Sequence, residues 1–338
     1  MTGSRIKLGG LLIALMISTS MADSQPLRGP AFSDPSRPVA MDFEWTQRPI
    51  VYDLWAKKEK ADLAVSLDQQ LYSMLADKIR AFAVREGITI ALQEGTCGIS
   101  GGMLMRKQVD MVGLCCPPGD TDRMPGIKYH TLGIASLAFV VNRENPLENI
   151  SLQQLRRIFQ GEFHRWSDVD LGPGINLPDW PIHVIGRLHC KLRPGHWRLL
   201  LDNGDLFSPR MQEVGTIPDM LYQVVSTPGG IGYESLFHAG KYGDKGTAKP
   251  IKVNGADPFN VDDVASLRYP LYRVFSISTW EGEHLTNPHA KKLLDFLMQE
   301  ADAQNGTQGF ISPSWLRKNG WQFMDNELVG EPLDRRGH

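Results

Sequence analysis

The chain has 338 residues, a formal net charge of −2 at pH 7 and a hydrophobic fraction of 42%. These values are typical of a globular protein with about two domains. A nearly balanced charge gives no general attraction to nucleic acid or to an anionic membrane, so an anionic ligand would need local donor groups. We therefore expect no nucleic-acid partner, and we expect the chain to be a monomer.

The N-terminus has the pattern of a secretory signal peptide over residues 1–22. Arg5 and Lys7 give a positive start, an apolar run covers residues 8–17, and the small residues Ser20 and Ala22 suit cleavage after Ala22. The apolar run is too short to cross the ~30 Å core of a bilayer as a stable helix. Residues 23–42 carry four prolines, which predicts an extended leader. The mature chain is expected in an oxidising compartment.

Helical and strand patterns alternate after this leader. Leu71, Leu75 and Ile79 recur at helical spacing, and Gly87 ends that helix. Further helices are predicted at residues 101–107, 152–159 and 290–298, and strands at residues 88–92, 109–114, 134–141, 182–185 and 271–277. The strand 134–141 is apolar on both faces, which favours a central place in a sheet. The alternation predicts an α/β fold with mainly parallel sheets.

Four groups of segments, in this order, carry a resemblance to a known family. They are Cys97 to Gly102 with residues 109–113; residues 134–142, 151–155, 158–161 and 166–169; residues 182–187 with 227–233; and residues 269–273 with 306–318. Together they are similar to the phosphate-binding, PstS-like proteins of bacterial ABC importers, from about Leu63 to Asp325. Residues 158–169 and the turn Ile231-Gly232-Tyr233 are the more specific of these motifs.

The resemblance implies a two-lobed periplasmic binding protein fold of type II, with two mainly parallel sheets joined by two crossing strands. Strands 134–141 and 271–277 are the expected crossings. Lobe 1 would cover residues 43–139 and 273–327, lobe 2 residues 140–272, and a C-terminal tail residues 328–338. It also implies a periplasmic solute-binding protein that passes its ligand to an ABC permease, with neither catalysis nor a cofactor.

An oxyanion site needs backbone N–H groups at a helix N-terminus, hydroxyl donors and usually an arginine. Ser100, Gly101 and Gly102 match the anion loop of this family, which precedes a helix. Arg187 follows a predicted strand at the place where the relatives pair an arginine with the anion, and its planar guanidinium suits a tetrahedral oxyanion. The resemblance thus implies that the cleft captures phosphate or a related anion such as arsenate.

Three loops depart from the family, one of them residues 65–68, which are a poor counterpart of its N-terminal donor loop. The Ser-Gly-Thr loop that follows the arginine is replaced by residues 188–197, where Gly195 is kept and His196 is a possible substitute donor. The Ser-Asp pair that follows the strand 109–114 is replaced by two thiols, which are weak acceptors. The ligand-binding residues expected from the sequence are Ser100, Gly101, Gly102, Cys115, Cys116, Arg187, Cys190, Gly195 and His196.

All four cysteines, Cys97, Cys115, Cys116 and Cys190, fall in loops that the resemblance places at the cleft. Exported proteins readily form disulfides, and Cys97 with Cys115 or Cys116 is a plausible pair within one lobe. Alternatively, the thiols are ligands for a thiophilic ion such as Cu(I), Zn(II) or arsenite. In that hypothesis the chain is a periplasmic sensor that signals to a histidine kinase. Neither a His-Glu-x-x-His nor a Walker motif is present, and we expect no enzyme.

Overall fold

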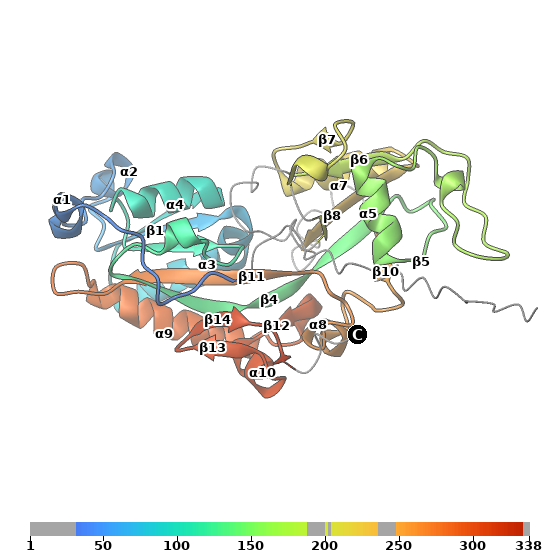
Figure 1. The fold of residues 1–338 in the computed structure, drawn as a ribbon. Helices are drawn as coiled ribbons and strands as arrows, with labels where there is room; N and C mark the ends of the chain where they lie inside the picture. Colours follow the sequence, from blue (N-terminus) through green and yellow to red (C-terminus); the bar gives the residue numbers. More distant parts are fainter. Residues whose placement is uncertain (1–31, 188–199, 202–203, 236–247, 334–338) are drawn as a thin grey trace, which may run out of the picture.

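The computed structural model describes residues 32–187, 200–201, 204–235 and 248–333 (Figure 1). The predicted signal peptide with its cleavage site, Cys190, Gly195 and His196 lie outside the described residues. Within the described ranges, no helix is long and apolar enough to span a membrane. Residues 32–42 of the predicted leader run along the body of the protein, where Val39 N donates to Arg123 O over 2.7 Å.

The first lobe is built on three parallel strands, β2 (Ile90–Gly95), β1 (Leu63–Asp68) and β3 (Met111–Leu114), with β1 in the middle. Every residue of β1 is buried. The helix α3 (Gln69–Glu86) begins directly after β1, because the Asp68 carboxylate accepts a hydrogen bond from Leu71 N (3.0 Å). It ends at Gly87, whose φ of 66° suits glycine, as the sequence predicted.

The helix α4 (Cys97–Met105) begins earlier than the sequence predicted. Thr96 caps it, and the Thr96 side chain accepts a hydrogen bond from Ile99 N. The predicted start at residue 101 was wrong because the glycines were taken as a turn. Gly101 and Gly102 instead lie inside the helix.

Two long strands connect the lobes. β4 (Ile127–Val141) is buried at almost every position and extends beyond the predicted strand at its N-terminal end. β11 (Tyr272–Trp280) pairs with it antiparallel, from Tyr272 opposite Ser136 to Trp280 opposite Ile127. The strand order β2-β1-β3-β11-β4-β8-β6-β7 therefore runs through both lobes, and the predicted α/β fold with two crossing strands is confirmed.

The second lobe places β8 (Gly230–Ser235) beside β4, followed by β6 (His183–Gly186) and β7 (Gln212–Glu213). The helix α5 (Leu152–Gln160) starts with a capping box between Ser151 and Gln154, and α7 (Ile217–Ser226) is capped by Thr216. Short strands β5 (Asn149–Ile150) and β10 (Lys252–Val253) pair with each other, and β9 (Lys249–Pro250) pairs with β4.

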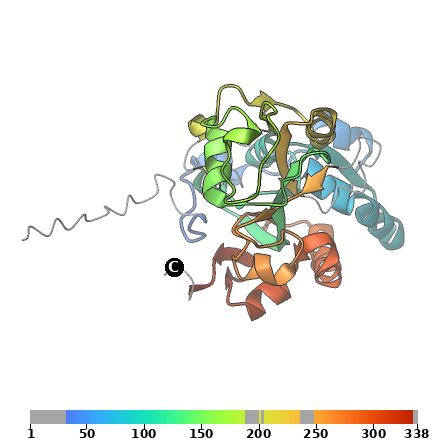
Figure 2. The same ribbon diagram turned by 90° about the vertical axis from the view of Figure 1, so that its right-hand side faces the viewer.

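The remaining elements come from the first and last parts of the described chain. They are α1 (Phe43–Gln47), α2 (Leu54–Lys58), α8 (Val261–Ala265), α9 (Pro288–Ala303), β12 (Phe310–Ile311), α10 (Pro313–Lys318), β13 (Gln322–Met324) and β14 (Glu327–Gly330). Figures 1 and 2 show the orange and red C-terminal elements gathered on one side of the β4–β11 pair. β12 adds a further antiparallel neighbour to β4.

The apolar core is divided in the same way as the sheet. One large cluster packs β1, β3, α3 and α9 together, and a second packs the far half of β4 with α5 and β8. The second cluster also takes in Ile311, Leu316, Trp321 and Leu328 from the C-terminal elements. The lobe boundaries given above remain a prediction, since Ile311, Leu316 and Trp321, which they assign to lobe 1, pack in the second cluster.

Candidate ligand site between the lobes

Four donors converge on one buried carboxylate where the two lobes meet. Glu234 is 1% exposed and accepts hydrogen bonds from Arg187 Nη1 (2.9 Å), Gln70 Nε2 (2.6 Å) and Ser235 N (2.8 Å). Arg273 Nη2 lies 2.5 Å from Glu234 Oε1, the oxygen that also accepts from Gln70 and Ser235 N, whereas Arg187 donates to Oε2. Charge-assisted hydrogen bonds of this kind are the strong ones in proteins. We call this group, with Gln69, the interlobe cluster.

The interlobe cluster is assembled from both lobes and from a crossing strand. Glu234 lies near the end of β8 and Arg187 follows β6, both in lobe 2, whereas Gln69 and Gln70 open α3 in lobe 1. Arg187 Nη2 donates to Gln69 Oε1 across the junction (2.8 Å). A pocket of about 410 Å³ adjoins it, lined by residues of α3 and of the start of α7.

The single negative charge of Glu234 does not balance the positive charge of the groups around it. Two guanidinium groups meet one carboxylate, and the partial positive end of the long helix α3 points at the same place. Asp68, which caps α3, is buried, and burial together with neighbouring Cys115 raises its pKa well above the usual range. Its carboxyl therefore favours the neutral form, and the donors that hold Glu234 suit any small oxyanion.

Buried polar atoms beside Glu234 lack partners among the described residues. They are the Ser235 hydroxyl and the carbonyl oxygen of the Gln70 side chain. Buried polar groups are almost always hydrogen-bonded in folded proteins. A serine hydroxyl that is left over next to two arginines is therefore an additional donor for a ligand.

Three thiols lie together directly beneath the interlobe cluster. Cys97 Sγ is 3.4 Å from Cys115 Sγ and 3.8 Å from Cys116 Sγ, and the three sulfur atoms all lie within 4.8 Å of one another. Each side chain is at most 3% exposed, and none of the three forms a disulfide in this structure. Arg273 Nη1 donates to Cys115 Sγ over 3.0 Å, so one guanidinium bridges Glu234 and the thiols.

The topology explains why these side chains meet. β1, β2 and β3 are parallel, and their carboxyl ends lead into Asp68, Cys97 and Cys115 respectively. The carboxyl ends of parallel strands lie at one edge of a sheet, which is where α/β proteins bind ligands. The sequence placed the cysteines at this edge through the resemblance, and the structure brings Cys97, Cys115 and Cys116 together there.

Ser100 lies at the same edge, but in a different setting from the expected anion loop. Its hydroxyl shares a hydrogen bond with Ser66 Oγ (3.0 Å), and its backbone N–H donates to Thr96 O within α4. Residues 98–102 match the Gly-x-Ser-x-Gly pattern of hydrolases. In that motif the serine sits on a strand-to-helix turn, whereas Ser100 is 0% exposed in the second turn of a helix. This segment is not a nucleophile elbow.

Sequence reasoning found Arg187 but missed Glu234, Arg273 and the two glutamines. A signal was present for the charged pair. Glu234 follows the turn Ile231-Gly232-Tyr233, and Arg273 follows Tyr269-Pro270-Leu271-Tyr272, both within strands that are otherwise buried. A single charge in a strand that is buried on both faces needs a partner. Two such charges of opposite sign in strands that both neighbour β4 are candidates for an ion pair.

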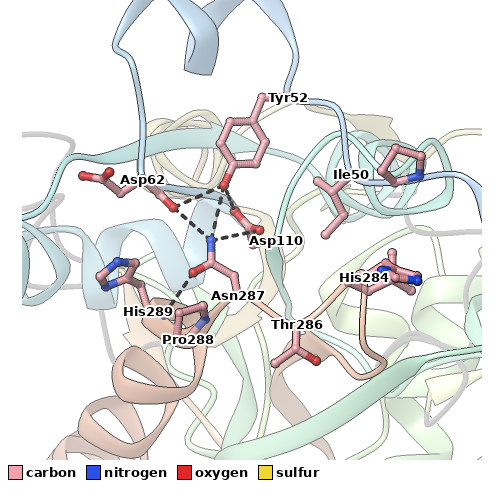
Figure 3. Close-up of a pocket in the computed structure, with 11 residues that line it drawn as sticks. Ile50, Tyr52, Asp62, Asp110, His284, Thr286, Asn287, Pro288 and His289 are labelled. Atoms are coloured by element: carbon pink, nitrogen blue, oxygen red, sulfur yellow. Dashed lines mark hydrogen bonds between the residues drawn. The ribbon is translucent and has the colours of Figure 1, made fainter.

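A second polar pocket, of about 460 Å³, lies at the opposite edge of the lobe 1 sheet (Figure 3). Asp110, before β3, accepts hydrogen bonds from Tyr52 Oη (2.6 Å), Ala64 N (2.8 Å) and Asn287 Nδ2 (3.2 Å). Burial raises the pKa of Asp110. Because its oxygens are satisfied by three elements of the lobe, this carboxylate ties the N-terminal segment and α9 to the sheet.

Two α/β lobes, two crossing strands and a cluster of charged groups at their junction define a two-lobed ligand-binding protein of the type II periplasmic binding protein fold. A family model described as a PBP superfamily domain matches residues 56–301. The chain belongs to this superfamily.

Solved structures support the same fold. A putative phosphate ABC transporter substrate-binding protein with bound phosphate from Clostridium perfringens is 17% identical with a TM-score of 0.63, covering 74% of this chain and 98% of its own. An ABC-type phosphate transport receptor from Vibrio cholerae is 20% identical with a TM-score of 0.57, covering 74% and 100%. A possible phosphate binding protein from Planctomyces limnophilus is 16% identical with a TM-score of 0.51, covering 76% and 94%. The family resemblance found in the sequence is thus confirmed for the fold.

Proposed function

We propose that this chain is a periplasmic receptor that binds a small inorganic oxyanion between its lobes and delivers it to an ABC permease. The observation that carries the proposal is the convergence of Arg187 and Arg273 on one buried carboxylate at the junction. The neighbours reported above are described as phosphate receptors or phosphate-binding proteins, and this supports phosphate or arsenate as the ligand. The superfamily supports binding rather than catalysis.

An oxyanion and a carboxylate offer the same kind of acceptor oxygen to guanidinium and amide donors. We propose that the ligand takes over the bonds that Arg187, Arg273 and Gln70 make to Glu234, and that the Ser235 hydroxyl adds a further one. Such a ligand contacts lobe 1, lobe 2 and a crossing strand at once. Because it then binds the closed arrangement better than an open one, it favours closure.

The predicted donors near this junction fit into the same proposal. The Ser100 hydroxyl lies beside Ser66 of β1, and Gly101 and Gly102 of α4 remain proposed donors to the ligand. Gly195 and His196 follow Arg187 in the chain and remain proposed contributors from outside the described residues. The signal peptide pattern supports export to the periplasm.

The alternative of a sensor that signals to a histidine kinase is not favoured. The structural neighbours reported above are described as transport receptors or phosphate-binding proteins, and none of these three descriptions mentions a kinase.

Calorimetry with inorganic phosphate and with arsenate tests the proposal. We expect Arg187→Met to weaken binding at least ~30-fold, because about 2 kcal/mol or more is lost when one charge-assisted donor is removed. Arg210→Met is the matched control, since Arg210 is a lobe 2 arginine that contacts Gly161 O and His164 on the exposed surface. Equal affinities for the Arg187→Met variant and the parent chain would refute the assignment.

A further inference from the structure

We propose that the thiols of Cys97, Cys115 and Cys116 form a binding site for a trivalent metalloid of the arsenite class. We call these three residues the three-thiol cluster. The inference rests on the sulfur positions, not on the proposed oxyanion function. The three side chains come from two separate loops, at the start of α4 and after β3, and the fold brings their sulfur atoms within 4.8 Å of one another.

The sulfur spacing fits a single central atom. With sulfur bonds of about 2.3 Å, as in zinc–thiolate sites, sulfur atoms lie about 3.4 Å apart in a pyramid with angles near 95° and about 4.0 Å apart in a planar arrangement. The observed Sγ–Sγ distances of 3.4 Å and 3.8 Å fall in this range. Three soft thiolate ligands select thiophilic centres over hard cations such as Mg²⁺ or Ca²⁺.

Burial decides between the thiophilic candidates. Cys97, Cys115 and Cys116 are 3%, 3% and 1% exposed, and an uncompensated charge is costly at such a place. The Arg273 guanidinium, which contacts Cys115, can offset the single negative charge of three thiolates around Zn(II), but Zn(II) prefers four ligands in a tetrahedron. Three thiolates around Cu(I) leave two negative charges. Three thiolates around trivalent arsenic leave no net charge. The cluster therefore favours the metalloid.

The binding reaction requires no oxidant or reductant. Arsenite near neutral pH is As(OH)₃, and each step breaks one As–O bond and forms one As–S bond. The thiol proton leaves with the hydroxide as water, so three thiols release three water molecules and arsenic stays trivalent. Arg273, which donates to Cys115 Sγ, stabilises the thiolate form of that sulfur, which is the attacking species.

The three-thiol cluster adjoins the interlobe cluster through Arg273, which contacts both Glu234 and Cys115. When the lobes separate, the bonds to Glu234 break and the carboxyl edge of the lobe 1 sheet becomes accessible. The ligand therefore reaches the thiols by the same route as the proposed oxyanion, although it uses different atoms.

The mature full-length protein, reduced and then freed of reductant, is incubated with sodium arsenite and desalted. We expect about one arsenic atom per chain by mass spectrometry and three As–S contacts by X-ray absorption at the arsenic edge. Ser substitution at Cys97, Cys115 or Cys116 is expected to reduce retained arsenic more than tenfold. Glu162→Gln, in an exposed ion pair with Arg157, is the control and should retain arsenic fully. Cys190→Ser tests whether the remaining cysteine of the chain is a ligand.

Several results would overturn the proposal. Oxygen ligands or fewer than three sulfur ligands in the absorption spectrum of the parent chain would do so, and that measurement needs no variant to fold. Loss of arsenic in Cys190→Ser would do so as well. Arg187→Met separates the two proposals, since it should lose phosphate binding and keep arsenite binding. An Arg187→Met variant that keeps phosphate binding and loses arsenite binding would contradict both proposals.

Discussion

Glu234 is the residue on which both arginines of the junction depend. Its carboxylate oxygens accept from Arg187, Arg273, Gln70 and the Ser235 backbone, and its exposed fraction is 1%. Removing one partner of a buried ion pair usually destabilises a protein strongly, because the other charge is left without compensation. Here the uncompensated charges would be the two guanidinium groups, which an oxyanion can also satisfy.

We therefore expect Glu234→Gln to bind phosphate more tightly than the parent chain, by about tenfold, which corresponds to ~1.4 kcal/mol. The amide no longer competes as an anion. In phosphate-free buffer the variant should melt at a lower temperature, and phosphate should raise its Tm more than that of the parent. Calorimetry and thermal unfolding measure both effects. Glu162→Gln, in an exposed ion pair with Arg157, is the control; a weaker affinity in Glu234→Gln would contradict the proposed exchange.

The residues of the junction show what a sequence can reveal about a site. Arg187 was predictable because it follows a strand at a position that the resemblance marks. Glu234 and Arg273 each carry a single charge in a buried strand, but their pairing depends on which strands neighbour β4. Those strands pair across 90 or more residues, which the sequence of either strand alone does not reveal. The sequence predicted that the cysteines lie at one edge of the sheet, but not that three sulfur atoms lie close together.

At the scale of helices and strands, capping residues made most predictions accurate. Ser151 starts α5 at Leu152 as predicted, through its hydrogen bonds with Gln154. The start of α4 was predicted wrongly because its sequence contains residues that disfavour a helix. Gly98, Gly101 and Gly102 weaken helix propensity, so the sequence favoured a turn, whereas the Thr96 cap and packing against β1 and β3 stabilise the helix.

Lys107 joins α1 to α4 and is buried. Its Nζ donates to the carbonyl oxygens of Trp45 (2.8 Å), Thr46 (3.3 Å) and Arg48 (2.7 Å) at the C-terminal end of α1, and lies 4.2 Å from the ring centre of Trp45. A cation at this end of a helix is favourable. The lysine is thus the main polar link between the N-terminal helix and the lobe 1 sheet.

Replacing Lys107 by Met keeps the aliphatic stem and leaves buried carbonyl groups without a donor. We expect the free energy of unfolding to fall by about 2–4 kcal/mol, since each unsatisfied buried group costs about 1–3 kcal/mol. Urea unfolding measures the change. Lys58→Met, at the exposed end of α2, should change stability by less than about 0.5 kcal/mol. Similar values for the two variants would show that the contacts of Lys107 contribute little.

At the scale of the whole molecule, acid stability depends on a histidine inside lobe 1. His130 lies on β4 with Nε2 2.8 Å from Thr279 Oγ1 of β11. Burial, followed by the nearby charge of Lys128, lowers the pKa of His130 from 6.5 to about 4. The folded protein therefore holds this imidazole neutral at a pH where the unfolded chain takes up a proton.

This pKa shift predicts the direction of the pH dependence. The contribution of His130 to stability is full above pH 6.5 and is lost as the pH falls from 6.5 to 4, because only the unfolded chain binds the proton there. The shift corresponds to about 3 kcal/mol in all. His130→Gln should therefore lose less stability than the parent between pH 7 and pH 4 in urea unfolding. His284→Gln, at an exposed position, should follow the parent curve; identical slopes for all three chains would disprove the prediction.

The α/β fold was predictable at this scale, because the alternation of helix and strand patterns and the long apolar strand at residues 134–141 both indicated it. The continuity of the sheet was not predictable. β11 lies between β3 and β4 and pairs with both, so the two sheets of the lobes share their central strands. Such pairing is set by tertiary packing and not by the composition of either strand.

The position of β11 also governs the order of folding. β3 and β4 arise in the first half of the chain, yet the strand that joins them ends at Trp280. Until that strand emerges, each presents an unpaired edge, and contacts of such large sequence separation form slowly. The central part of the sheet is therefore completed only when most of the polypeptide is available.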